Sequence, residues 1–249
     1  MSIERNTSAS AIVRTDLLWE TLNFHKAQTI CDSEKIPLVV CTALDKCSTS
    51  TLNHHDCDYL LRLNLTSSKL QDCLPGFVPL YVGMPVVLKC KNISTDLHIT
   101  NRSQGLVRDI HTAAICPAGF TYCTCVLVEF PNGKVELSGL LKGYFLIVPV
   151  QSKFSTRLIT DDGMTIAIQV THYQVPIQPA FAVTGQSAQG KTLPEVLANI
   201  HEGGFGAYIA TSRACTWDGI CVTEPVTLKQ LNKPIPFSLL LEDRYDCML

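Results

Sequence analysis

The sequence has no long apolar run, and it carries little charge. No stretch of its 249 residues approaches the ~18 consecutive apolar residues that a membrane-spanning helix needs. The start of the chain, MSIERNTSAS, also lacks the apolar centre of a secretory signal peptide. Charged residues make up only 17% of the chain, but hydrophobic residues make up 46%, which favours a globular protein over a disordered one. We therefore expect a soluble, intracellular protein with no membrane partner.

The chain also lacks the positive charge and the cysteine spacing that would indicate particular ligands. Its net charge is −2, so the overall charge does not indicate a nucleic-acid-binding protein, although a local basic groove is compatible with it. Twelve cysteines are present, but no two of them have the C-x-x-C spacing typical of zinc sites. His54, His55 and Cys57 are possible ligands, but the usual ligand spacing is absent. We expect free thiols and no bound metal.

Strand-like and helix-like patterns alternate at both ends of the chain, which is typical of an α/β domain with a parallel sheet. A β-branched run at residues 11–15 leads into apolar residues at helical spacing from Leu17 to His25, and residues 37–42 form a second strand-like run. Residues 45–51 are polar and loop-like, and residues 56–70 are helix-like.

The middle of the chain has a different pattern. Short strand-like runs separated by Asn, Gly and Pro turn signals occur at residues 78–89, 104–110, 122–130 and 144–148. This succession favours a small β-barrel. A further strand is predicted at residues 165–171. The predicted organisation is therefore an α/β domain formed by residues 1–74 and 151–249, interrupted by a β-barrel at residues 75–150.

Residues 185–192, GQSAQGKT, match the G-x-x-x-x-G-K-[ST] pattern of a phosphate-binding P-loop. An apolar run at residues 180–183 precedes them and a helix-like stretch at residues 193–200 follows, as a P-loop requires. However, no later apolar run ends in the Asp that such enzymes use to hold Mg²⁺. The residues after the loop are also too few for a parallel sheet with its crossovers. A stand-alone P-loop NTPase is therefore an alternative rather than the main interpretation.

Two ordered segments support a different interpretation. The first is FAVT followed by QGKT, at residues 181–184 and 189–192, and the second is YIATSR followed by DGI, at residues 208–213 and 218–220. Together they resemble motifs V and VI of superfamily-1B DNA helicases, the 5′-to-3′ branch that includes RecD and the petite-integration-frequency and Helitron-transposon helicases. Residues 80–88, LYVGMPVVL, are similar to the family's segment leading into its SH3-like barrel. AIVR, at residues 11–14, resembles motif IV.

The resemblance implies a second RecA-like domain, of the P-loop NTPase type with a parallel sheet, interrupted by a small SH3-like β-barrel. It implies that Arg213 is the arginine finger that reaches the γ-phosphate of ATP and stabilises transition-state charge. Further nucleotide-binding residues implied by the resemblance are Arg14, Gln189, Gly190 and Lys191.

The DNA-binding or coupling residues that the resemblance implies are Thr184, Gln186, Ser187 and Thr192. The family's His-Lys-Ser is Gln186-Ser187-Ala188 here, so a cation that would lie near DNA phosphates is missing.

The sequence contains no Walker A strand–loop–helix near its start and no Asp-Glu Walker B, the features of the family's ATP-binding first domain. The resemblance therefore implies a C-terminal fragment that needs ATP, Mg²⁺, single-stranded DNA and a first domain supplied in cis or in trans. Alone, the chain is expected not to hydrolyse ATP. Likeness to eukaryotic transposon helicases suggests a nuclear location. A non-enzymatic module whose barrel binds single-stranded DNA or a protein is a further alternative.

Overall fold

The computed structural model describes most of the chain, namely residues 10–13, 16–47, 51–63, 74–89, 92–115, 120–159, 163–184, 188, 192–198, 200 and 204–232. The chain divides into two compact units. The first unit combines Met1–Trp19 with Phe181–Leu249, and the second unit is Glu20–Ala180. The domain boundaries expected after residues 74 and 150 stay a prediction.

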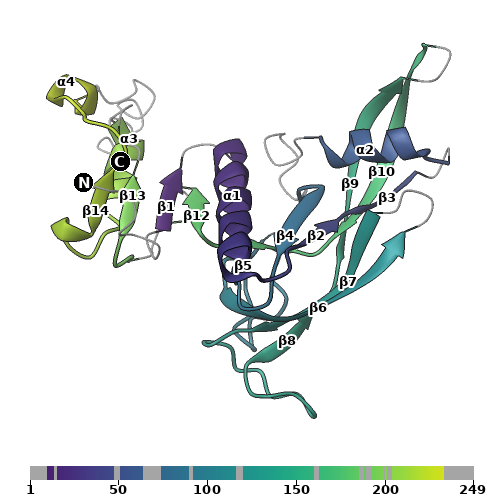
Figure 1. Ribbon diagram of the computed structural model, residues 1–249, viewed down its shortest axis with the longest axis horizontal. Coiled ribbons are helices and arrows are strands. Elements are labelled where there is room, and N and C mark those ends of the chain that lie inside the picture. Colours follow the sequence, from purple (N-terminus) through teal and green to yellow (C-terminus); the bar gives the residue numbers. More distant parts are fainter. Residues whose placement is uncertain are drawn as a thin grey trace, which may run out of the picture. The chain divides into compact units, whose positions relative to one another are not determined.

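A parallel sheet of four strands forms the centre of the first unit, and it joins the two ends of the sequence (Figure 1). Its order is β12 (Ala182–Thr184), β1 (Ser10–Val13), β13 (Val196–Ala198) and β14 (Ile220–Val222). β1 pairs in parallel with β12 on one side and β13 on the other. A strand from the start of the chain is therefore central to a sheet whose other strands come from its end.

Small apolar residues fill the core of the first unit. Helix α3 (Gly204–Thr211) packs against β13, and the short helix α4 (Leu228–Leu231) packs against α3. The buried core residues are Ile12, Ala188, Val196, Ala198, Ile200, Ala207 and Ala210. At the other side of the sheet, the indole N–H of Trp19, in α1 (Asp16–Glu34), donates to the carbonyl oxygen of Ala182 at 2.6 Å. Trp19 is only 3% exposed, so this bond fixes the start of α1 against β12.

The second unit contains two sheets, and the larger one is mainly antiparallel. Its path is β11 (Ile177–Pro179), β5 (Pro85–Leu88), β6 (Gln104–Ile115), β7 (Phe120–Glu129), β2 (Val39–Thr42) and β4 (Phe77–Leu80), with β8 (Tyr144–Ile147) also paired to β7. The exception is the parallel pairing of β2 with β7. Long β6 and β7 form the centre of this sheet.

The smaller sheet of the second unit has three antiparallel strands in the order β3 (Leu44–Cys47), β10 (Thr165–Gln174) and β9 (Val150–Ile159). Helix α2 (His54–Leu61) covers one face, where Leu60 packs with the buried side chains of Phe154 and Val170. Asn53 begins this helix with a capping box, because its side chain accepts from the Asp56 N–H and the Asp56 carboxylate accepts from the Asn53 N–H.

The cysteines of the described residues are free thiols, and Cys31, Cys41 and Cys123 among them are buried. Burial is the main cause that raises the pKa of the Cys57 thiol, and the carboxylates of Asp45 and Asp56 raise it further. Burial is also the main cause that raises the pKa of the Cys31 thiol, so Cys31 and Cys57 are protonated at neutral pH and pack as small apolar groups.

The predicted mixed α/β class is confirmed, with one parallel sheet and sheets of antiparallel or mixed pairing. Two local predictions were wrong. Residues 45–51 were expected to be a loop, but β3 extends through Cys47. Residues 193–200 were expected to be a helix, but residues 196–198 form β13, which is paired on both sides. A short apolar run can be a buried parallel strand or a helix, and periodicity alone does not separate the two. None of the described helices is long and apolar enough to cross a membrane.

Candidate functional site

The carboxyl ends of β1 and β12 lie side by side at one edge of the parallel sheet. Val13, the last residue of β1, is in register with Thr184, the last residue of β12. Arg14 follows Val13 directly in the sequence, and the GQSAQGKT segment follows Thr184. Open parallel sheets bind ligands at the carboxyl ends of their strands. The topology therefore brings the starts of two predicted site segments to the same edge.

Several predicted site residues lie outside the described residues, namely Arg14, Gln186, Ser187, Gln189, Gly190 and Lys191. Thr184 is described only by its position in β12. Thr192 is exposed, directly after the GQSAQGK residues, and Arg213 is half-buried. The roles assigned to these residues from the sequence stay predictions.

Backbone hydrogen bonds hold Arg213 beside the residue that follows Thr192. The Leu193 N–H donates to the Arg213 carbonyl oxygen at 2.7 Å, and the Cys215 N–H donates to the Leu193 carbonyl oxygen at 2.9 Å. These two bonds form a short parallel bridge between Leu193 and Ala214. Leu193, the residue after the first helicase-like segment, is therefore hydrogen-bonded to Arg213, the last residue of YIATSR in the second segment.

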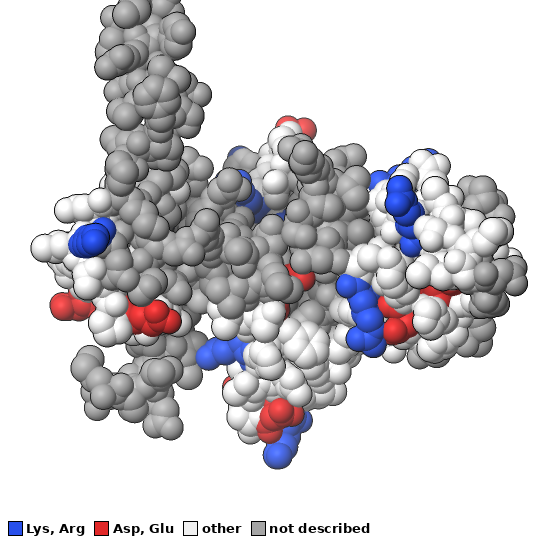
Figure 2. Space-filling model, turned by 90° about the horizontal axis from the view of Figure 1, so that it is seen from above, with Lys and Arg blue, Asp and Glu red and all other residues white. Residues whose placement is uncertain are grey.

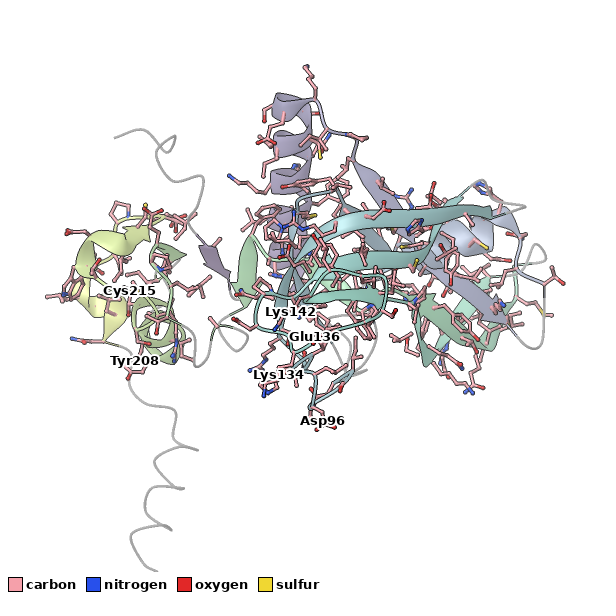
Figure 3. The ribbon with its side chains drawn as sticks, turned by 90° about the horizontal axis from the view of Figure 1, so that it is seen from below. Asp96, Lys134, Glu136, Lys142, Tyr208 and Cys215 are labelled. Carbon is pink, nitrogen blue, oxygen red and sulfur yellow. The ribbon has the colours of Figure 1, made fainter. Side chains whose placement is uncertain are left out.

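Arg213 takes this position because it lies in the turn that ends α3. The Thr211 hydroxyl donates to the Ala207 carbonyl oxygen at 2.9 Å, and the Ser212 N–H donates to the Tyr208 carbonyl oxygen at 2.9 Å. The second bond satisfies one of the last four carbonyl groups of α3, which have no intrahelical partner. Ala207 is buried in the core, whereas Tyr208 is 66% exposed and is labelled on the outer side of α3 in Figure 3. Because α3 is anchored in the core through Ala207, the position of Arg213 directly after the helix is fixed.

The side chain of Arg213 has an unused hydrogen-bond donor. Its Nε atom is buried and has no hydrogen-bond partner among the described residues. The ion pairs formed within the same part of the chain do not involve Arg213 either. A buried donor without a partner costs about 1–3 kcal/mol. A guanidinium in this condition is suited to an anion such as a phosphate group.

A close backbone contact explains the glycine in the segment Asp218-Gly219-Ile220. A Cβ placed on Gly219 would lie 2.2 Å from the carbonyl oxygen of Pro194, closer than real Cβ atoms come. Gly219 ends the turn Trp217–Gly219, which leads directly into β14. Pro194 directly follows Leu193. The turn therefore packs against the same short segment whose Leu193 is hydrogen-bonded to Arg213. Resemblance pointed to the segment, but no pattern in the sequence showed this packing.

The described residues do not provide the context of a P-loop. A P-loop is followed by a helix whose N-terminus faces the phosphates. Here β13 follows instead, at residues 196–198. Ala188, in the middle of GQSAQGKT, is fully buried in the core of the first unit with Ile12 and Val196. Within the described residues, the strand–loop–helix arrangement that supported a stand-alone P-loop NTPase is therefore absent.

Comparison with known proteins gives the same fold. No protein-family model and no curated protein sequence matches the chain. Among solved structures, the Pif1 helicase from Candida albicans matches 100% of this chain and 52% of its own, with a TM-score of 0.59 and 19% identity. The chain has the fold of one half of a Pif1 helicase.

Two structures of the Pif1 helicase from Bacteroides support this likeness. The one bound to single-stranded DNA matches 98% of this chain and 47% of its own, with a TM-score of 0.59 and 16% identity. The one in complex with ADP-AlF3 and single-stranded DNA matches 99% and 47%, with a TM-score of 0.60 and 17% identity. The resemblance to superfamily-1B helicases is thus confirmed as a likeness of fold. The chain spans about half the length of the helicases that it matches.

Proposed function

We propose that this chain is the second motor half of an ATP-dependent 5′-to-3′ DNA helicase. One observation carries the proposal, which is the backbone bridge that holds Arg213 beside Leu193. It connects the two segments that resemble helicase motifs V and VI, within a chain that matches Pif1 structures along its whole length. On this proposal the first unit is the RecA-like domain, and the second unit contains an SH3-like barrel.

In the proposed motor, Arg213 is the arginine finger. Its buried Nε donor has no acceptor among the described residues, so its guanidinium can contact the γ-phosphate without breaking an existing ion pair. Charge develops on the oxygens around the transferred phosphoryl group, and a guanidinium placed there in advance stabilises it. An arginine finger contributes about 10³–10⁵-fold to kcat in related phosphoryl-transfer enzymes.

The loop after β12 would couple this nucleotide contact to DNA. In this account the residues that would contact the nucleotide are Arg14, Gln189, Gly190 and Lys191. Thr184, Gln186, Ser187 and Thr192 face or support single-stranded DNA. The register of Val13 with Thr184 supports the proposal, because it starts both segments at the same sheet edge.

ATP and Mg²⁺ would be held mainly by a first domain that is supplied in cis or in trans. The described residues fit a phosphate group, through Arg213, but they contain no group of three His, Cys, Asp or Glu side chains that could hold a metal ion. When bound, Mg²⁺ neutralises charge on the phosphates. The residues of this chain would orient the γ-phosphate. A nuclear location is proposed on the likeness to eukaryotic transposon helicases.

The test compares the chain alone with a longer protein in which an ATP-binding first helicase domain is joined to it. We expect ATP hydrolysis stimulated by single-stranded DNA in the longer protein and none in the chain alone. Two results would overturn the proposal. One is a longer protein without DNA-stimulated hydrolysis. The other is hydrolysis by the chain alone that Lys191→Ala abolishes and Arg213→Ala leaves intact, which would restore the P-loop interpretation.

A further inference from the structure

The three-stranded sheet of the second unit has one covered face and one open face. Successive side chains of a strand point to opposite faces, so the register assigns each residue. Phe154 and Val170 are directly opposite each other on the covered face, under α2. Lys153 and Thr171, one residue earlier on β9 and one later on β10, are therefore on the open face.

Register and burial agree on the composition of this open face. On β9 its residues alternate with the covered ones and are all exposed. The open face is made by Gln151, Lys153, Ser155, Arg157 and Ile159 of β9, Thr165, Ala167, Gln169, Thr171 and Tyr173 of β10, and Leu44 and Lys46 of β3. It is mostly polar and carries hydroxyl and amide groups between its charges.

All charged side chains on the open face are positive, namely Lys46, Lys153 and Arg157. None of these takes part in the ion pairs that the described residues form. Asp161 and Asp162 are in the connection between β9 and β10, outside the described residues. Towards the right of Figure 2, blue side chains lie together at the upper edge without red ones between them. In a chain with net charge −2, this face is a local concentration of unpaired cations.

The spacing of these cations suits a polyanion. Lys46 and Lys153 are both paired with Thr171, so they are in one row, two strand spacings or about 10 Å apart. Arg157 is four residues beyond Lys153 on β9, a distance of about 13 Å along the strand. The ammonium of Lys46 lies 5.4 Å from the centroid of the Tyr173 ring, which holds this charge over the face.

We propose that this open face binds the sugar–phosphate backbone of single-stranded DNA, outside the groove of the motor itself. The partner rests on the proposed function, because DNA is the polyanion on which a helicase acts. Separated cations with hydroxyl and amide donors between them match a chain of phosphates and sugars. The exposed side chain of Ile159, at 73%, and the ring of Tyr173 add apolar surface for bases near the two ends of the face.

The test measures binding of a fluorescent single-stranded oligonucleotide to the full chain over a range of salt concentrations. The variant is the triple substitution Lys46→Gln, Lys153→Gln and Arg157→Gln. We expect about tenfold weaker binding at low salt. The slope of log K against log salt should fall by about 2, because each phosphate contact on a single strand contributes about 0.7.

The matched control removes the same charges elsewhere on the second unit, by Arg62→Gln, Lys134→Gln and Lys142→Gln. Arg62 is paired with Asp58, and Lys142 is paired with Glu136. Figure 3 shows Lys134, Glu136 and Lys142 together in the connection between β7 and β8. This control should leave the affinity and the salt slope nearly unchanged, and far-ultraviolet circular dichroism should show that both variants are folded.

Four results would overturn the inference. Two are equal loss of binding in both triple variants and no loss in either. The third is stronger competition by poly-glutamate than by the oligonucleotide, which would indicate an acidic protein partner. The fourth is stronger competition by duplex DNA than by the single strand. This binding test can fail while the proposed function holds, and the reverse, because binding at this face requires neither ATP hydrolysis nor Arg213.

Discussion

Replacing Gly219 by alanine tests the packing that supports the candidate site. The new Cβ would lie 2.2 Å from the Pro194 carbonyl oxygen, so one of the two backbone segments must move. Forcing a methyl group into a closed contact costs about 1–3 kcal/mol. Replacement of glycine by alanine also reduces the entropy of the unfolded chain, which returns about 0.4–1 kcal/mol. We expect a net loss of about 1–2 kcal/mol, since the contact atom is backbone and cannot rotate away.

Tryptophan fluorescence isolates this effect. The chain has two tryptophans, and Trp19 and Trp217 are both in the first unit. Trp19 is 3% exposed and Trp217 is 87% exposed, so Trp217→Phe leaves a single buried reporter with little effect on stability. In that background, Gly219→Ala should lower the urea midpoint by about 0.5–1 M, for an m-value of about 2 kcal/mol/M.

A control glycine separates this clash from a general effect of glycine substitution. Gly139 is in the second unit, has open space around its Cβ position and a φ of +83°. An alanine is strained at this φ, but the strain lies in the second unit, so Gly139→Ala should leave the transition reported by Trp19 in the first unit unchanged. An unchanged urea midpoint for Gly219→Ala would refute the reasoning, because the turn would then not be packed on Pro194.

Two further substitutions test buried polar contacts. Trp19→Phe removes the donor to the Ala182 carbonyl, so the first unit should lose about 1–3 kcal/mol in urea unfolding, and a loss below 0.5 kcal/mol would contradict the contact. The buried hydrogen bond between Asp45 and His172, whose Oδ1 and Nδ1 atoms are 2.6 Å apart, predicts a loss of about 1–3 kcal/mol for Asp45→Ala by thermal unfolding, because the buried ring nitrogen loses its partner. Asp45→Leu combined with His172→Phe should recover most of it, whereas an equal loss in the double variant would argue against a cost from an unsatisfied buried polar group.

The sequence predicted those strands whose own residues carry the signal. β-branched and apolar runs located β1, β2, β7 and β8 to within a few residues. β9 was missed because its covered face carries Ser152 and Thr156 beside Phe154 and Leu158, so apolar residues do not alternate strictly with polar ones. The sequence of β3 predicts a loop, because its inward side chain, Asp45, is a carboxylate. It is buried by a histidine 127 positions later, which no local pattern can reveal.

The candidate site was predictable only in part. Resemblance selected Arg213 and the segment around Thr192, but their spacing in the sequence did not show that Leu193 bridges them. The P-loop pattern was misleading, because the apolar residues after Thr192 form a strand between β1 and β14 rather than a helix. Whether such a short apolar run forms a strand or a helix depends on its pairing with distant strands, and the local sequence carries no information on that pairing.

The central claim is that Arg213 completes an ATP site formed with a first helicase domain. Its most direct test is the steady-state rate of DNA-stimulated ATP hydrolysis by the protein that includes this domain, with Arg213→Ala compared with Arg62→Ala. Arg62 is an exposed arginine paired with Asp58, so its loss should leave the rate unchanged. We predict that Arg213→Ala lowers kcat by about 10³-fold or more, with little change in the KM for ATP. An unchanged kcat, or a loss found only in KM, would contradict the account.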